Sequence, residues 1–167
     1  MKIITYIFIV FLMTNLSAQD AESYYKQGMQ KASAGNFDVA IGLFSKALEI
    51  NPEYASAYMQ RGFAYSLEQK YDVAIKDFTK AIELKPKHVW TYKNRGMAYG
   101  KEGKHNLAKK DFNKMIQLDP ENQEAYNNRG FAKKALGDKK GACEDWVKSK
   151  KLGNGEAKII LKNNHCK

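Results

Sequence analysis

Small and aromatic residues recur along this chain at a fixed interval of 34 residues. When the sequence is laid on itself, a tyrosine, a glycine, an alanine and a large aromatic residue each coincide in four consecutive segments. The four sets are Tyr24, Tyr58, Tyr92 and Tyr126; Gly28, Gly62, Gly96 and Gly130; Ala40, Ala74, Ala108 and Ala142; and Phe44, Phe78, Phe112 and Trp146. Such a period indicates one supersecondary unit used four times.

Each repeat carries two groups of residues with helical spacing. The tyrosine and glycine lie four residues apart, on one face of a first helix, and the alanine and large aromatic residue do the same on a second helix. Turn residues separate the two helices at 35–36, 69–70, 103–104 and 137–138, and three of these pairs contain glycine, which helix C-termini prefer. Because proline cannot continue a helix, the second helices end near Pro52, Pro86 and Pro120. We predict an all-α chain of four helix-turn-helix repeats at 21–54, 55–88, 89–122 and 123–156.

These residues resemble the tetratricopeptide-repeat (TPR) family over about residues 21–154. The resemblance implies a right-handed α-α superhelix, the TPR solenoid, whose concave groove is lined mainly by the first helices. At the seventh place the family's usual aliphatic residue is replaced by Gln27, Arg61, Arg95 and Arg129, and we interpret the arginines as a scaffold variant. Three acids, Asp77, Asp111 and Asp145, also recur at one place, and we expect them to be solvated or helix-capping.

The N-terminus has the pattern of an export signal. Lys2 precedes an apolar run at residues 3–13 that is short for a bilayer span, and Leu16-Ser17-Ala18 supplies small residues for a signal peptidase. We predict a signal peptide at 1–18, a TPR domain at 19–154, and a capping helix and tail at 155–167. The protein is then periplasmic or secreted, with no stable membrane insertion after signal removal; an uncleaved membrane anchor is the alternative.

The C-terminal segment contains both cysteines, Cys143 and Cys166. An export signal indicates an oxidising compartment, where disulfides persist. The midpoint between the two falls in the turn at residues 153–155, so that they lie opposite each other in an antiparallel hairpin. We predict a Cys143–Cys166 disulfide that holds a short helix over residues 157–164, and similar tails in exported bacterial TPR proteins support it. Two free thiols, one buried and one frayed, are the alternative.

The formal net charge is +10, and it is unevenly distributed along the chain. Residues 21–54 contain three lysines and four acids, whereas residues 157–167 contain three lysines and no acid. Such a surface attracts anionic partners at low salt, although it also serves solubility. The chain has no nucleic-acid motif. Binding of an anionic polymer or envelope surface by the basic C-terminal half is therefore an alternative function.

The sequence offers no constellation of residues for catalysis. His88, His105 and His165 share no helical face with one another or with a carboxylate at metal-ligand spacing. A phosphate-binding loop is also missing. We therefore expect no enzyme activity, no metal and no cofactor.

The TPR resemblance implies which residues line the groove. The positions carried over from the family give a ladder of methionine and aromatic side chains flanked by amides, which suits an extended or helical peptide with apolar side chains. The expected partner-binding residues are Tyr25, Met29, Met59, Phe63, Trp90, Lys93, Asn94, Met97, Asn127, Asn128 and Phe131. The alternative for Met29, Phe63, Met97 and Phe131 is packing between neighbouring first helices.

One TPR subtype does not match. Co-chaperone TPR domains that grip acidic C-terminal tails use a set of lysines, asparagines and an arginine from three successive first helices. In either possible alignment, only Asn94 fits that set. The sequence therefore predicts a non-catalytic scaffold that binds a protein or peptide without this carboxylate clamp. A self-assembling structural stack is a further alternative.

Overall fold

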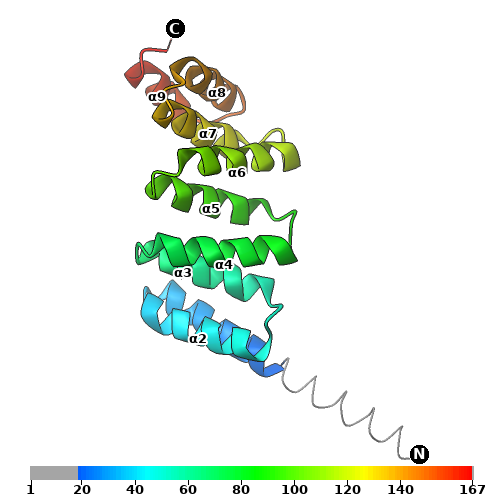
Figure 1. Cartoon of the computed structure of the whole chain (residues 1–167). Coiled ribbons are helices and arrows are strands. Elements are labelled where there is room, and N and C mark those ends of the chain that lie inside the picture. The colour runs from blue at the N-terminus through cyan, green and yellow to red at the C-terminus, as the bar shows by residue number, and fades with distance from the viewer. Residues whose placement is uncertain (1–18, 167) are drawn as a thin grey trace, which may run out of the picture. The chain divides into compact units, whose positions relative to one another are not determined.

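The computed structural model describes residues 19–166, and every regular element in that range is an α-helix (Figure 1). The predicted signal peptide lies outside the described residues. The helices form two compact units that divide between Leu84 and Lys85. None of the helices described is long and apolar enough to cross a bilayer. The all-α prediction is confirmed.

The N-terminal unit contains two helix pairs. A helix over residues 19–33 precedes α2 (Phe37–Ile50), and α3 (Ala55–Leu67) pairs with α4 (Tyr71–Leu84). Helix α3 also packs against α2, so that the two pairs form one continuous core.

The C-terminal unit begins with α5 (Val89–Lys101) paired with α6 (His105–Leu118). The second pair is α7 (Gln123–Ala135) with α8 (Lys139–Lys151), and α9 (Ala157–Asn163) follows. Each helix packs against the next one in the chain. The order of packing therefore follows the order of the sequence, as expected when every unit buries its apolar face on a neighbour.

The recurring glycine and the recurring aromatic residue meet inside each repeat. A Cβ atom built on Gly28 would lie 2.6 Å from the ring of Phe44, and one on Gly96 would lie 2.7 Å from that of Phe112. Both rings are buried, with at most 4% of their surface exposed. The glycine is thus required because the ring of the second helix occupies the space of a side chain on the first.

The turns between paired helices share one hydrogen-bond pattern. After α5, the Lys104 amide donates to the Tyr99 carbonyl at 2.8 Å and the Gly103 amide donates to that of Gly100 at 3.1 Å. This is the Schellman arrangement, which needs a left-handed residue after the helix. Gly103 supplies it with φ 72°, whereas Gln69 adopts φ 59° at the matching position after α3. Gln69 therefore bears backbone strain that glycine avoids.

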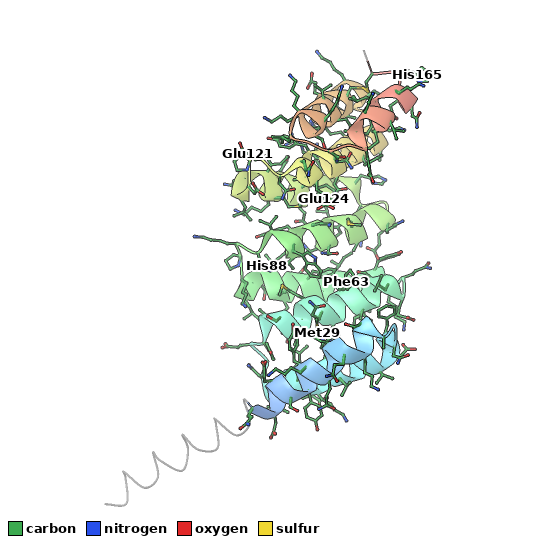
Figure 2. The ribbon with its side chains drawn as sticks, turned by 180° about the vertical axis from the view of Figure 1, so that it is seen from behind. Met29, Phe63, His88, Glu121, Glu124 and His165 are labelled. Atoms are coloured by element: carbon green, nitrogen blue, oxygen red, sulfur yellow. A yellow bond between two sulfur atoms is a disulfide. The ribbon has the colours of Figure 1, made fainter. Side chains whose placement is uncertain are left out.

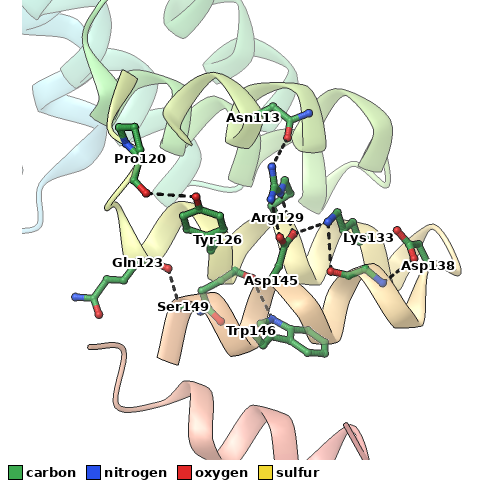
Figure 3. Close-up of polar contacts among 12 residues, drawn as sticks. Asn113, Pro120, Gln123, Tyr126, Arg129, Lys133, Asp138, Asp145, Trp146 and Ser149 are labelled. Carbon is green, nitrogen blue, oxygen red and sulfur yellow. Dashed lines mark hydrogen bonds and ion pairs between the residues drawn. The ribbon is translucent and has the colours of Figure 1, made fainter. Parts of the chain in front are cut away.

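The repeated arginines and aspartates form one ion pair in each of the last three repeats. Arg61 donates through Nε and Nη2 to the two carboxylate oxygens of Asp77, both at 2.8 Å. Arg95–Asp111 and Arg129–Asp145 repeat this bidentate geometry, the latter drawn in Figure 3. Such pairs are among the stronger polar contacts in proteins.

These carboxylates are buried: Asp77 is 5% exposed and Asp111 and Asp145 are each 4% exposed. Our expectation that they are solvated or helix-capping is wrong, because a spacing rule within one helix does not reveal a partner on the other. The arginines are scaffold residues, as interpreted. In the first repeat the same places hold Gln27 and Leu43, so both partners are replaced together.

Helix α9 is attached to α8 by the two cysteines. Cys143 and Cys166 are joined through their sulfur atoms with a Cα–Cα distance of 5.6 Å, which is the pairing predicted. Ala157 is buried, and Ile160 and Leu161 are half-buried toward the unit. The helix ends at Asn163, one residue earlier than predicted.

Replacing Gln69 by glycine should stabilise the protein by about 0.5–1 kcal/mol, because glycine adopts the left-handed region without strain. The matched change Gly103→Gln should destabilise it by a similar amount. Urea denaturation followed by circular dichroism measures both, and equal effects of the same sign would contradict this account of the turns.

A double-mutant cycle should expose the energy of the Arg61–Asp77 pair. Arg61→Gln leaves a buried carboxylate without its cation and should cost about 2–3 kcal/mol. Combining it with Asp77→Leu recreates the first repeat's own residues, so the double variant should recover at least about 1 kcal/mol relative to the sum of the single losses. If urea denaturation shows that the loss in free energy of unfolding of the double variant equals the sum of the two single losses, the interaction between Arg61 and Asp77 does not contribute to stability.

Candidate functional site

In the N-terminal unit, one of the four predicted groove residues, Met59, is buried, and Tyr25 is partly buried against the core. Tyr25 packs its ring against those of Phe44 and Tyr54, with centroids 5.8 and 5.0 Å apart, and Met59 is only 7% exposed. Met29 and Phe63, labelled in Figure 2, are half-buried. Direct contact of a partner with Tyr25 and Met59 is therefore limited by their packing.

A tyrosine–carboxylate contact lies beside this aromatic cluster. The Tyr54 hydroxyl donates a hydrogen bond to Glu22, which sits on the first helix. This hydrogen bond lowers the pKa of Glu22. Burial and the same bond raise the pKa of Tyr54, so Tyr54 remains a neutral donor at physiological pH. The contact joins the first helix to the segment that leads into α3.

In the C-terminal unit, the predicted residues separate into packed and open positions. Asn94 is 9% exposed, and its side-chain amide donates to the Trp90 carbonyl at 2.8 Å, so it is occupied by its own helix. Trp90 is half-buried with its ring edge toward His88. Met97 and Phe131, in contrast, are each 46% exposed although they are large and apolar. Because they border one cavity, they form a candidate contact surface rather than two isolated exposed residues.

Met97 and Phe131 border a cavity of about 390 Å³ between α5 and α7, with α6 at its base. We call it the groove cavity. Its lining also includes Gly96, Gly100, Lys101, His105, Ala108, Phe112, Asn128, Ala132 and Ala135. Three predicted site residues, Met97, Asn128 and Phe131, are thus brought together. Pockets of this size with mostly apolar walls and a few polar groups are typical of ligand sites.

The predicted site residues do not include the small residues of this cavity. Gly100 has no atom within 4 Å of the position where its Cβ would be, so the space above it is open. Ala132 and Ala135 border the same space from α7. The signal was present in the sequence as isolated small residues late in the first helices, but a small residue marks the absence of a side chain rather than a contact.

The α7 residues that line the groove cavity are held in place by contacts with α8. The Phe131 ring meets the Trp146 ring edge-on with centroids 5.3 Å apart, and Trp146 Nε1 donates to the Asn127 carbonyl at 3.2 Å. Arg129, two residues before Phe131, is held by Asp145, and their hydrogen bonds raise the pKa of the arginine. Figure 3 shows Asp145 and Trp146 on the same helix, with Asp145 bonded to Arg129 and Lys133. The cavity wall is therefore preorganised, which lowers the entropic cost of binding.

Comparison with known proteins identifies the family. Residues 55–88 and 89–122 match one model of the tetratricopeptide repeat, and residues 21–54 match a second model of the same repeat. The chain belongs to the tetratricopeptide-repeat family, and its fold is that family's all-α superhelical repeat fold. No curated protein sequence matches the chain.

Several solved structures are similar to this chain. A crystal structure of MamA has 25% identity and a TM-score of 0.78, covering 83% of this chain and 81% of that one. MamA 41-end from Desulfovibrio magneticus RS-1 has 25% identity and a TM-score of 0.76, with coverages of 80% and 75%. The first TPR of Spaghetti (RPAP3), bound to the HSP90 peptide SRMEEVD, has 29% identity and a TM-score of 0.70, with coverages of 72% and 95%.

Two glycines of α5 should respond in opposite ways to alanine. Gly100→Ala should stabilise the protein by about 0.5–1 kcal/mol, because the methyl group enters open space and the helix gains propensity. Gly96→Ala should destabilise it by about 1–3 kcal/mol, because the methyl group meets the buried Phe112 ring. Thermal or urea unfolding of the two variants checks both signs, and a loss of stability in Gly100→Ala would mean that the groove cavity is already filled.

Proposed function

We propose that this protein is a non-catalytic scaffold that binds a peptide or protein segment in the groove cavity, in the periplasm or outside the cell. TPR proteins are in general non-catalytic interaction scaffolds, and the similar RPAP3 domain binds an HSP90 peptide. The observation that carries the proposal is the pair of exposed apolar side chains, Met97 and Phe131, on either side of an apolar cavity. Burying these two side chains supplies binding energy, and methionine adapts to irregular partners.

The expected ligand differs from that of the RPAP3 domain. That domain is bound to a peptide with an acidic end. Here the groove cavity is mostly apolar, and the carboxylate-clamp positions hold only one matching residue, Asn94, whose amide donates to its own helix. An apolar side chain therefore provides the main anchor. Export rests on the signal pattern at residues 1–18.

The basic C-terminal half remains a second candidate surface. Helix α8 presents exposed lysines, among them Lys140, Lys148 and Lys151, and α9 adds Lys158 and Lys162. An anionic polymer bound there would be released by salt, because exposed charges are screened within about 10 Å at 0.1 M ionic strength. Binding in the apolar groove cavity is far less sensitive to salt.

Capture from an envelope and culture-fluid extract tests the proposed site. Wild-type protein should retain a partner at moderate salt that the variant Met97→Ser/Phe131→Ser loses by at least about tenfold, because the two anchors no longer bury apolar area. The control is Leu107→Ser on α6, which changes a 39%-exposed apolar residue that does not line the groove cavity.

Quantitative mass spectrometry of the retained proteins distinguishes the candidates. A partner held equally by the wild type and both variants, but eluted by added salt, would move the function to the basic face. A partner lost equally with Leu107→Ser would show that the variants act through the fold.

A further inference from the structure

A second cavity lies at the opposite end of α7, within the same C-terminal unit. It measures about 470 Å³ and is formed by the first turns of α7 and the turn between α8 and α9. We call it the polar cavity. Its lining residues are Gln123, Glu124, Asn127, Asn128, Gly153, Asn154, Gly155 and Glu156. Asn128 borders both cavities, so the two are neighbours along α7.

The polar cavity has a charge opposite to that of the whole chain. The protein carries a formal net charge of +10, yet this lining contains two carboxylates and no cationic side chain. Glu124, labelled in Figure 2, forms an ion pair with Lys93 of α5, with 2.7 Å between Lys93 Nζ and Glu124 Oε1. The Glu124 side chain remains half exposed. Glu156 is exposed at the start of α9. The local field therefore favours a cation despite the basic surface elsewhere.

Asn127 adds a buried hydrogen-bond acceptor without a partner. Its side chain is among those lining the polar cavity, the residue is 9% exposed, and its Oδ1 atom makes no hydrogen bond. A buried acceptor without a hydrogen bond is unfavourable, because it has lost its contact with water. Because the terminal torsion of asparagine is soft, the amide can rotate to present this oxygen to a donor in the cavity. A ligand N–H would satisfy it.

The separation of the two cavities sets the spacing of the side chains that can fill them. The residues of α7 that line the two cavities are centred about six positions apart, which corresponds to about 9 Å along a helix. A peptide in the polyproline conformation advances about 9 Å in three residues and returns its side chains to the same face. One extended segment that runs parallel to α7 therefore has the side-chain spacing needed along the helix axis for both cavities.

We infer that the polar cavity binds the lysine or arginine side chain of a peptide segment whose apolar side chain, three residues away, fills the groove cavity. This inference rests on the proposed peptide-binding function and specifies its ligand. The ligand cation approaches Glu156, Asn127 and Glu124, and it competes with Lys93 for the last of these. In the free protein, Lys93 thus supplies Glu124 with the positive charge that the ligand cation supplies on binding.

Matched peptides test the pairing of cation and apolar anchor. The probes are acetylated, amidated peptides with lysine and leucine three residues apart, separated by two prolines. Two counterparts carry glutamine for the lysine or serine for the leucine. Each is titrated into ¹⁵N-labelled protein, purified after expression of the full 167-residue chain, and followed by NMR.

We expect the lysine–leucine peptide to bind at least about threefold more tightly than the glutamine counterpart, as a partly exposed ion pair allows. The lysine–leucine peptide should shift the NMR signals of the backbone amides of residues that line both cavities. Glu156→Gln should remove most of that preference. The control Glu144→Gln removes an exposed carboxylate of α8 that does not line the polar cavity, and it should leave the preference intact.

The other outcomes overturn the inference in distinguishable ways. If the lysine and glutamine peptides bind equally and shift only the groove cavity, the cation site is wrong while the proposed function stands. If Glu144→Gln weakens binding as much as Glu156→Gln, the preference is unspecific charge attraction. If no peptide shifts either cavity at millimolar concentration, the inference and the proposed function both fail.

Discussion

The approach of a glycine to an aromatic ring determines how the two helices of every repeat lie. At Gly96 the first helix comes so close to Phe112 that no side chain fits, and the ring then forms part of the base of the groove cavity. In the fourth repeat the ring is Trp146, whose indole also bonds the Asn127 carbonyl. The open surface of the first helices is therefore placed by the contacts that they make with the second helices.

The arginine–aspartate pairs extend this constraint from one repeat to the next. While two nitrogens of Arg61 hold Asp77, its Nη1 donates to Ser45 of the preceding repeat at 2.9 Å. Arg129 reaches Asn113 in the same way at 2.8 Å. In the first repeat the pair is replaced by Gln27 and Leu43.

The sequence predicted the helices, the turns and the cysteine pair because each depends on short-range rules. Proline, glycine and the 34-residue period mark where helices begin and end. The site was predicted less completely. Met59 is a groove position in the family but is buried here, and Tyr25 packs partly buried against the core. The burial of Asp77 depends on an arginine 16 residues away. The groove cavity itself is lined partly by Gly100 and Ala132. Their small side chains leave the space open, and a sequence pattern that looks for contacts does not detect such a space.

Arg61 bonds Asp77 within its own repeat and Ser45 in the preceding repeat, and this arrangement affects which segments of the chain can be duplicated without losing contacts. A copied segment that spans residues 55–88 carries a complete ion pair and also finds an acceptor in the copy before it, since Thr79 occupies the place of Ser45. A copy of residues 21–54 inserted between later repeats would bring neither charge and would leave the neighbouring helices without this link. Duplication of residues 55–88 therefore preserves the hydrogen bonds between repeats that a copy of residues 21–54 would interrupt.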